Sequence, residues 1–454
     1  MNTPIYDFVE SYAGSQMSRM HMPGHKGKTF LGCEKSDITE IDGADVLYHP
    51  DGIIAQSEDN ATALWGSAHT YYSTQGSSLC ISAMLSLVSM QCASGKPHIL
   101  AARNVHKAFV HAAALLDADV SWVYPKDHRT HICSAKVCAD DIEKAIESAH
   151  QKIDAVYITS PDYLGVISDI KSISAVCRKH SILLLVDNAH GAYLAFCKEN
   201  LHPIHSGADM CCDSAHKTLP VLTGGAYLHI SKQSPSFCKD ARRALSLFAS
   251  TSPSYLILQS LDLCNDYLEN RFVSQLEDCI AKTKNLKLHI QACGFFVAES
   301  EDLKIVVDAK KSGFSGNALA DFIRNYGVEC EFSDDDYVVF MTSPQNDEND
   351  FERLSNAFLQ IKPGPPVDQE ILPAHTPHRQ ALSIRQAVLS KHERMDIKNA
   401  HGRICALPLV SCPPAVPFII SGEVITENDI RLFEKYGIDE IEVVASESTV
   451  KQLQ

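Results

Sequence analysis

One lysine in this sequence is placed where its amine could act as a nucleophile. Lys217 lies in residues 213–220 (DSAHKTLP), directly after the apolar residues 208–212 (ADMCC), which predict a short buried strand. A lysine at the end of a buried strand loses part of its hydration, so the pKa of its ammonium falls and the amine can form a Schiff base. A lysine that merely extends from a strand end into water would look the same in this stretch.

A carboxylate follows a second buried strand, 30 residues before that lysine. Residues 182–186 (ILLLV) form a continuous apolar run, typical of a parallel strand covered on both faces, and Asp187 comes directly after it. Ligands of open α/β sheets bind at the carboxyl ends of such strands. A buried carboxylate needs a cationic partner, and a pyridinium nitrogen would serve. A lysine for an aldehyde and an aspartate for a ring nitrogen predict a pyridoxal 5'-phosphate (PLP) site.

A third stretch could bind the phosphate of such a cofactor. Gly76, Ser77 and Ser78 precede an apolar helical stretch at 81–90. Backbone N–H groups and the dipole of a helix start attract an anion, and the two hydroxyls add donors. The same residues also suit an ordinary helix N-terminus.

The elements that must position these residues alternate along the chain. Strands are predicted near 98–101, 120–124, 155–160 and 225–230, and helices at 57–65 with Ser57 as N-cap, 108–116, 140–150 and 255–272. This alternation favours a mostly parallel, covered sheet. Residues 285–360 again alternate short strands with helices and predict a smaller domain, followed by a linker at 362–366 (KPGPP) and a helix at 383–393.

Composition narrows the class of protein. The net charge of −16 argues against a nucleic-acid or anionic-membrane surface and is compatible with a cationic substrate. The 16 cysteines form no Cys-x-x-Cys pair, so we expect small buried side chains in a reducing compartment and no metal site. The N-terminus shows no signal-peptide pattern and no run reaches membrane-spanning length, which predicts a cytoplasmic protein.

Three motifs in order carry a family resemblance. Residues 214–220 (SAHKTLP), 187–191 (DNAHG) and 21–27 (HMPGHKG) together resemble the bacterial ornithine/lysine/arginine decarboxylases. These are PLP enzymes of the aspartate-aminotransferase fold, and the match is to their short form, which lacks a long N-terminal wing. The resemblance implies an α/β protein of PLP fold type I, whose large domain has a mostly parallel seven-stranded sheet, with a smaller α/β domain and a C-terminal α+β domain. We place an N-terminal arm at 1–50 and the three domains at 51–255, 256–362 and 363–454.

The resemblance also assigns roles to single residues. Lys217 would hold PLP, Asp187 would keep the ring nitrogen protonated, and His106 would stack on the ring, although a histidine after a strand is more often merely hydrogen-bonded. His216 or Lys217 would return a proton to Cα after CO2 leaves. The remaining cofactor contacts implied are Gly76, Ser77, Ser78, Ala189, His190, Ser214 and His216.

Other residues imply a partner subunit and a substrate. His25 lies in an arm that would border the partner's active site, unless it is a solvated loop. Thr251 and Ser252 would reach the phosphate of the partner's cofactor, and their segment could equally cap the next helix. Glu423 is a candidate for the distal charged end of the substrate, with an exposed turn carboxylate as the alternative. We therefore expect a homodimer or larger assembly with its active site at the subunit interface.

The expected function is PLP-dependent decarboxylation of arginine, lysine or ornithine to the corresponding amine, a carboxy-lyase reaction of polyamine biosynthesis. The sequence departs from the family pattern at Gln75, Cys80, Ala415 and Ser421. Two alternatives therefore remain open. One is an aminotransferase or lyase, for which Arg324 could bind the substrate carboxylate, and the other is an inactive homologue that serves as a partner subunit.

Overall fold

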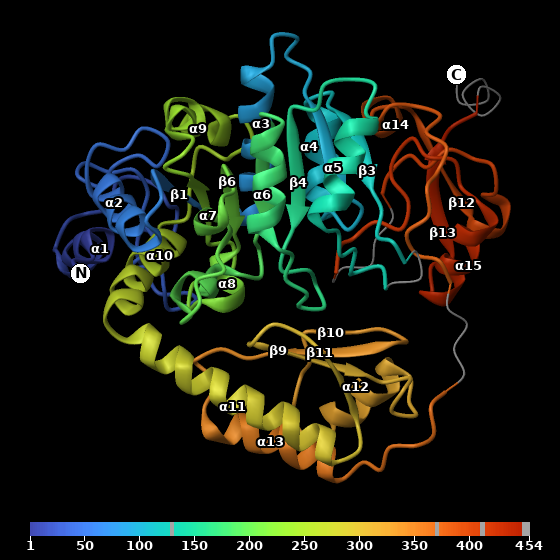
Figure 1. Ribbon diagram of the computed structural model, residues 1–454. Coiled ribbons are helices and arrows are strands. Elements are labelled where there is room, and N and C mark those ends of the chain that lie inside the picture. The colour runs from blue at the N-terminus through green and yellow to red at the C-terminus, as the bar shows by residue number, and fades with distance from the viewer. Residues whose placement is uncertain (128–130, 368–371, 409–413, 447–454) are drawn as a thin grey trace. The chain divides into compact units, whose positions relative to one another are not determined.

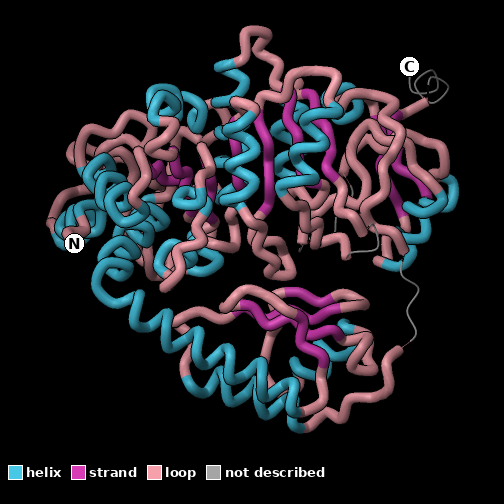
Figure 2. Tube along the Cα trace, in the orientation of Figure 1, coloured by secondary structure: helices cyan, strands magenta, loops and turns pink. Residues whose placement is uncertain are grey.

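The computed structural model describes residues 1–127, 131–367, 372–408 and 414–446. Contacts divide the chain into two units, one of residues 1–91 with 177–276 and one of residues 92–176 with 277–454. Helices and strands alternate along most of the chain, as the cyan and magenta of Figure 2 show. The finer domain boundaries at 50, 255 and 362 stay predictions.

The largest sheet has seven strands in the order β1-β7-β6-β5-β4-β2-β3 (Figure 1). β7 is antiparallel to both β1 and β6, whereas β5 is parallel to β6, and β2 is parallel to β3 and β4. The prediction of a mostly parallel seven-stranded sheet is confirmed. The strands are β1 His69–Ser73, β2 His98–Ala102, β3 Asp119–Val123, β4 Ala155–Thr159, β5 Leu183–Asp187, β6 Met210–Asp213 and β7 Ala226–Ile230.

The first unit contributes β1, β5, β6 and β7 to this sheet. Among its residues, all of which the structure describes, are also seven complete α-helices. They are α1 Pro4–Gly14, α2 Ile53–Trp65, α3 Gly76–Gln91, α7 Pro203–Ser206, α8 Ala215–Thr218, α9 Cys238–Ser246 and α10 Tyr255–Tyr267, with short 3-10 turns at Ala192–Phe196 and Pro235–Phe237. A π-helical turn, Leu268–Phe272, joins α10 to α11 Val273–Ala292, which continues into the second unit.

The second unit adds β2, β3 and β4, a four-stranded sheet in the order β10-β11-β9-β8, and the antiparallel pair β12-β13. Its strands outside the large sheet are β8 Phe296–Ala298, β9 Lys304–Asp308, β10 Phe332–Ser333, β11 Tyr337–Met341, β12 His392–Asp396 and β13 Glu440–Val444. Its helices are α4 Lys107–Leu115, α5 Ala139–Ser148, α6 Ile170–Lys179 (whose end belongs to the first unit), α12 Gly316–Arg324, α13 Glu348–Leu359, α14 Ile384–Val388 and α15 Glu427–Lys435, with a 3-10 turn at Ile397–Asn399.

Residues 4–14, within the segment that we place as an N-terminal arm, form a helix. Two expectations about local structure were wrong. Ser57 lies inside α2 and is fully buried, where its hydroxyl bonds Tyr72 and Asp262, so it is not the N-cap. The predicted helix at 383–393 ends at residue 388, because residues from 392 onward pair with β13 instead. In each case a contact distant in sequence overrides local propensity.

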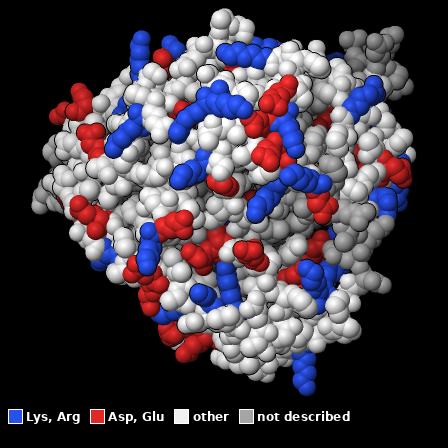
Figure 3. Space-filling view, viewed as in Figure 1, with Lys and Arg blue, Asp and Glu red and all other residues white. Residues whose placement is uncertain are grey.

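Charged side chains of both signs lie on the surface of the molecule. On the face drawn in Figure 3, Lys and Arg side chains alternate with Asp and Glu side chains. Among the described residues, every helix is too short or too polar to span a bilayer.

Gly316, the first residue of α12, allows a close backbone approach that generates a prediction. A Cβ added there would lie 2.4 Å from the carbonyl oxygens of Asp334 and Tyr337, and backbone atoms cannot easily give way. We expect Gly316→Ala to lower the free energy of unfolding by about 1–3 kcal/mol in urea titrations. Gly14→Ala is the matched control, since a Cβ there would meet nothing within 4 Å. An equal loss in both variants would contradict the packing argument.

Candidate active site

The strand ends of the first unit bring several predicted site residues together. β1 and β6 are both antiparallel to β7 and therefore run in the same direction, and β5 runs parallel to β6. The carboxyl ends of these three strands thus lie at one edge of the sheet, where the last residues are Ser73, Asp187 and Asp213. This edge is the place where open α/β sheets bind ligands.

The side chain of Lys217 reaches a histidine that follows Asp187. Lys217 lies in the single-turn helix α8 and is half-buried, and its Nζ is 3.0 Å from Nε2 of the buried His190. The preceding residue, His216, donates from Nδ1 to the carbonyl oxygen of Gly225 (2.9 Å), which leaves Nε2 as the basic nitrogen of a neutral ring. An amine and an imidazole within hydrogen-bond distance therefore lie at this edge, and a second imidazole precedes the lysine in sequence.

The start of α3 provides a cradle for an anion. Gly76 adopts φ 70° and donates its N–H to the carbonyl of Gly224 (2.7 Å), which joins the helix start to the loop after Lys217. A Cβ at Gly76 would meet nothing within 4 Å, so space remains beside the turn. The hydroxyl of Ser214 donates to that of Ser77 (2.7 Å), and Ser78 is exposed in the same turn. The first N–H groups of a helix lack intrahelical acceptors and can bind an anion.

Asp187 is a buried carboxylate, 2% exposed, at the end of β5. Its Oδ1 accepts from the neutral amide of Ala189 (3.2 Å) and lies 3.8 Å from the neutral thiol of Cys212. Two further buried atoms, Oδ1 of Asn188 and Oγ1 of Thr218, have no hydrogen-bond partner among the described residues. A lysine amine, an anion cradle and a buried carboxylate on one sheet edge fit the aldehyde, phosphate and ring nitrogen of PLP.

The sequence analysis predicted no role for Asp213, although this residue begins the lysine motif at 213–220. Asp213 is fully buried, and its Oδ2 lies 2.9 Å from Nε2 of His202 and 3.0 Å from Nε2 of His229. Its Oδ1 accepts from the side-chain amide of Asn188 (2.7 Å). An aspartate at the end of a buried strand was the available signal, but its partners come from three separate stretches of sequence.

Protonation within this cluster follows from its geometry. Burial acts to raise the pKa of Asp213, but His202 and His229 outweigh it and hold the pKa below the ordinary value of 3.8. Burial lowers the pKa of His229 below 6.5 in spite of the carboxylate. Nδ1 of His229 pairs with the hydroxyl of Thr70 (2.9 Å), which can donate to a neutral ring. Asp213 is therefore an anion held by hydrogen bonds from two histidines and one asparagine.

His106 and Glu423 belong to the second unit. His106 is the N-cap of α4, where its Nδ1 accepts the N–H of Ala108 (3.1 Å), so the expected hydrogen bond exists and the predicted ring stacking stays a prediction. Glu423 is 1% exposed and pairs with Arg103 at 3.2 Å, so the alternative of an exposed turn carboxylate is wrong. Cys412 and Pro413, which lie shortly before Ala415 in sequence, are outside the described residues.

The residues predicted to serve a partner subunit lie in the first unit. His25 is half-buried, with Nε2 3.2 Å from Oδ2 of Asp37, in the segment after α1. Thr251 and Ser252 are both exposed, and the N-cap of α10 is Ser254, which accepts from Ile257. The segment therefore caps the helix as the alternative proposed, and it does so without the hydroxyls of Thr251 and Ser252.

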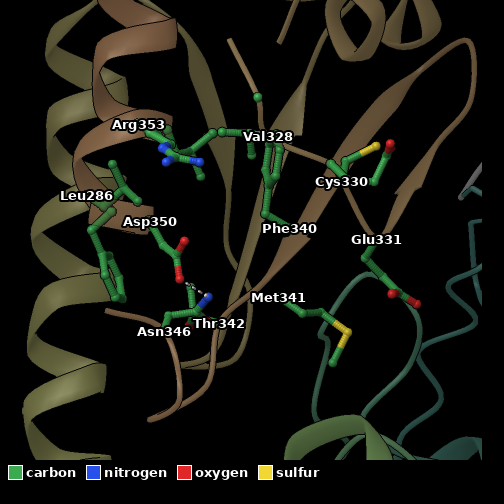
Figure 4. A pocket seen from close by; sticks show the side chains of 14 residues that line it. Leu286, Val328, Cys330, Glu331, Phe340, Met341, Thr342, Asn346, Asp350 and Arg353 are labelled. Atoms are coloured by element: carbon green, nitrogen blue, oxygen red, sulfur yellow. Dashed lines mark hydrogen bonds between the residues drawn. The ribbon is translucent and has the colours of Figure 1, made fainter. Parts of the chain in front are cut away.

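A pocket of about 320 Å³ lies elsewhere, beside the four-stranded sheet of the second unit (Figure 4). Its lining includes Leu286 of α11, Phe340 of β11 and Arg353 of α13. The predicted site residues do not line this pocket, and its polar groups do not converge on one point in the close-up. We assign it no part in the candidate site.

The Asp213 cluster generates a prediction about acid stability. Because the folded pKa lies below 3.8, ionised Asp213 stabilises the protein above that pH, and the contribution is lost as the pH falls below it. In Asp213→Asn an amide N–H₂ faces donors, so we expect a loss of about 2–4 kcal/mol near neutral pH in urea titrations, shrinking below about pH 3.8.

The matched control for that prediction is Asp240→Asn, on the partly exposed face of α9. Its expected change is within about 0.5 kcal/mol. A variant at position 213 as stable as the control would show that the cluster contributes no net stability.

Comparison with known proteins gives consistent matches. The model of the Orn/Lys/Arg decarboxylase major domain matches residues 3–309, and that of the C-terminal domain matches residues 369–436. The chain is 29% identical to an arginine decarboxylase of Bacillus subtilis (strain 168), over 95% of this chain and 93% of that protein. It is 27% identical to an arginine decarboxylase of Halalkalibacterium halodurans, over 94% and 92%.

Solved structures show the same fold. A lysine decarboxylase of Francisella novicida aligns with a TM-score of 0.79 at 17% identity, covering 98% of this chain and 81% of that one. The constitutive lysine decarboxylase of E. coli aligns with a TM-score of 0.76 at 16% identity, covering 98% and 82%. The predicted fold class is thereby confirmed. Since the major-domain match alone spans most of the chain and includes both Asp187 and Lys217, this protein belongs to the Orn/Lys/Arg decarboxylase family.

Proposed function

We propose that this protein uses PLP to decarboxylate a basic amino acid, with arginine as the first substrate to test, and releases CO2 and the corresponding amine. The observation that carries the proposal is the single sheet edge that holds Lys217, Asp187 and the start of α3. Arginine is placed first because the relatives matched over nearly the whole chain include proteins named arginine decarboxylase.

Different residues of this sheet edge would bind different parts of the cofactor. The amine of Lys217 would hold the aldehyde, and Nε2 of His190, 3.0 Å away, could take the proton that the amine must lose to react. The buried carboxylate of Asp187 would stabilise a proton on the ring nitrogen. Ser77, Ser214 and the N–H groups of α3 would hold the phosphate.

When bound, PLP supplies an electron-poor ring that takes up the electron pair left as the bond between Cα and the carboxylate breaks. His106 would cover one face of that ring and exclude water from it. A proton must then reach Cα, and His216, whose Nδ1 donates to Gly225, could deliver one from Nε2 after that nitrogen has itself taken up a proton. Lys217 is the alternative donor.

The aminotransferase alternative depended on Arg324, which would have to bind a substrate carboxylate. Arg324 lies at the end of α12, partly exposed, and pairs with Glu329 (2.8 Å) and with Asp321. A guanidinium that already has two carboxylate partners is a poor candidate for that task. An inactive homologue would bind no cofactor, which the first experiment decides.

The first experiment is a visible spectrum of the purified protein, before and after arginine, lysine or ornithine is added, with evolved CO2 recorded. We expect a yellow protein and CO2 from one of the three. Lys217→Ala should lose both the absorbance of bound cofactor and all measurable turnover, because the covalent attachment is gone. Lys232→Ala, at an exposed lysine of the same unit, is the control that should keep both.

A colourless wild-type protein that cannot be loaded with PLP would overturn the proposal. A yellow protein that changes colour with substrate but releases no CO2 would move the reaction class to aminotransferase or lyase. Activity retained by Lys217→Ala would remove this lysine from the mechanism.

The proposal includes a homodimer in which the arm reaches the partner. The segment after α1 exposes large apolar side chains, with Met20 91%, Phe30 89% and Leu31 83% exposed in the single chain. Apolar side chains gathered in one exposed segment mark an interaction surface. Burying them against a second copy would also bring His25, which lies between them in sequence, toward that copy.

We expect the double variant Phe30→Ser with Leu31→Ser to weaken self-association by about tenfold or more in sedimentation velocity, because it removes apolar area from the interface. Leu359→Ser, at a 55% exposed residue that ends α13, is the control and should leave association unchanged. A monomeric wild-type protein, or equal association in both variants, would contradict the assignment.

A further inference from the structure

Residues 103–107 of the second unit are held in place on both sides of His106. Arg103 follows β2, its N–H bonds the carbonyl of Val123 in β3 (3.1 Å), and its side chain is only 2% exposed. A buried guanidinium must have its donors satisfied and its charge balanced. The partners of Arg103 therefore show what fixes the backbone just before His106.

Three of these partners come from the C-terminal part of the chain, more than 300 residues away. Arg103 donates to the carbonyl oxygens of Pro417 (3.3 Å) and Phe418 (3.1 Å) and to Oε2 of Glu423 (3.2 Å). Its guanidinium also lies 5.3 Å from the ring centre of Trp122, close enough for a cation–π contact.

Glu423 makes several hydrogen bonds within this group of residues. Its Oε2 accepts from the N–H of Ile420 (2.7 Å) as well as from Arg103, and its own N–H bonds the carbonyl of Ile420 (3.0 Å). Nδ1 of His378 lies 3.8 Å from the same oxygen, and Nε2 of that ring pairs with Asp429 (2.9 Å). Two carboxylates, one guanidinium and one imidazole thus form a buried network of ion pairs and hydrogen bonds.

A second tie holds the other side of His106. Lys107, the first residue of α4, donates its N–H to the carbonyl of Ala415 (2.9 Å). Ala415 has φ 58°, a left-handed conformation in which an L side chain is strained, so tertiary contacts must hold this turn. The ring between the two ties is itself fixed, since Nδ1 of His106 accepts from Ala108.

We propose that residues 415–423 form a clamp that positions His106, and that Glu423 acts through Arg103 as a positioning residue and does not bind the substrate. This inference rests on the proposed function, in which His106 covers the cofactor ring. The charge of Glu423 is already paired with a buried arginine, so a cationic substrate would have to compete with Arg103 for it. The clamp replaces the substrate role that the sequence suggested for Glu423.

The decisive variant is Glu423→Gln, which keeps the shape and one acceptor but removes the charge that holds Arg103. We expect kcat to fall about 10- to 100-fold with KM within about twofold, since a displaced group near the reacting centre costs rate. The circular dichroism of bound PLP should change as well. Glu440→Gln is the matched control, because Glu440 forms an exposed pair with Arg394 in the same unit, and it should leave all three unchanged.

A substrate-binding role for Glu423 predicts the opposite pattern. In that case KM for the basic amino acid would rise by about tenfold or more while the spectrum of bound PLP stayed the same. Either that result or a variant indistinguishable from Glu440→Gln overturns the clamp.

The hydrogen bond from Lys107 to Ala415 can be removed without changing the charges around Arg103 and Glu423. Lys107→Pro removes the N–H that bonds Ala415, while proline is tolerated at the first position of a helix. His106 has φ −68° and ψ 147°, which a following proline accepts. Lys107→Ala keeps the N–H and is the control. We expect the proline variant alone to lower kcat about tenfold and to alter the dichroism of bound PLP.

Hydrogen exchange separates failure of the clamp from failure of the proposed function. In cofactor-free protein, the amides of residues 104–108 should exchange at least about tenfold faster in Glu423→Gln than in wild type or Glu440→Gln. Unchanged exchange overturns the clamp, even where wild type binds PLP and releases CO2. Faster exchange in a protein that binds no PLP would leave the clamp standing as a structural device and overturn its link to the reaction.

Discussion

The buried carboxylate of Asp213 is the contact on which the candidate site depends. It receives hydrogen bonds from His202 before α7, from His229 on β7 and from Asn188 just after β5. An anion in the interior is tolerated only when such donors surround it. Because Asn188 follows Asp187 and Asp213 precedes Ser214, this one carboxylate ties the strand end that carries Asp187 to the loop that carries Lys217. It thereby sets the spacing on which the cofactor assignment rests.

Two other hydrogen bonds at this sheet edge hold a further part of the candidate site in place. The N–H of Gly76 on the carbonyl of Gly224 and the hydroxyl of Ser214 on Ser77 join the start of α3 to the lysine loop. The chemistry of an amino-acid decarboxylase needs an amine, a ring-nitrogen partner and a phosphate cradle in fixed positions, and parallel strand ends supply such positions. Membership in the Orn/Lys/Arg decarboxylase family is consistent with this arrangement.

Buried charge is also important in the second unit, where it argues against the role that the sequence suggested for Glu423. Glu423 looked like a carboxylate available to a cationic substrate, but it lies beside a buried arginine. A carboxylate in that place is required by the arginine, since an unpaired guanidinium in the interior would be strongly destabilising. The network with His378 and Asp429 links the C-terminal part of the chain to the segment of His106 and explains why an acidic side chain is needed there.

The sequence by itself determined the alternating strands and helices, the strand ends at Asp187 and Asp213, and the lysine and glycine–serine motifs, because these depend on local apolar runs and turn chemistry. It also determined the family, since several motifs in order are specific where one is not. The tertiary structure alone decided the strand order, the partners of Asp213 and the pairing of Arg103 with Glu423. Those contacts join residues far apart in sequence, and their energies come from burial and charge balance, which no local pattern of residues encodes.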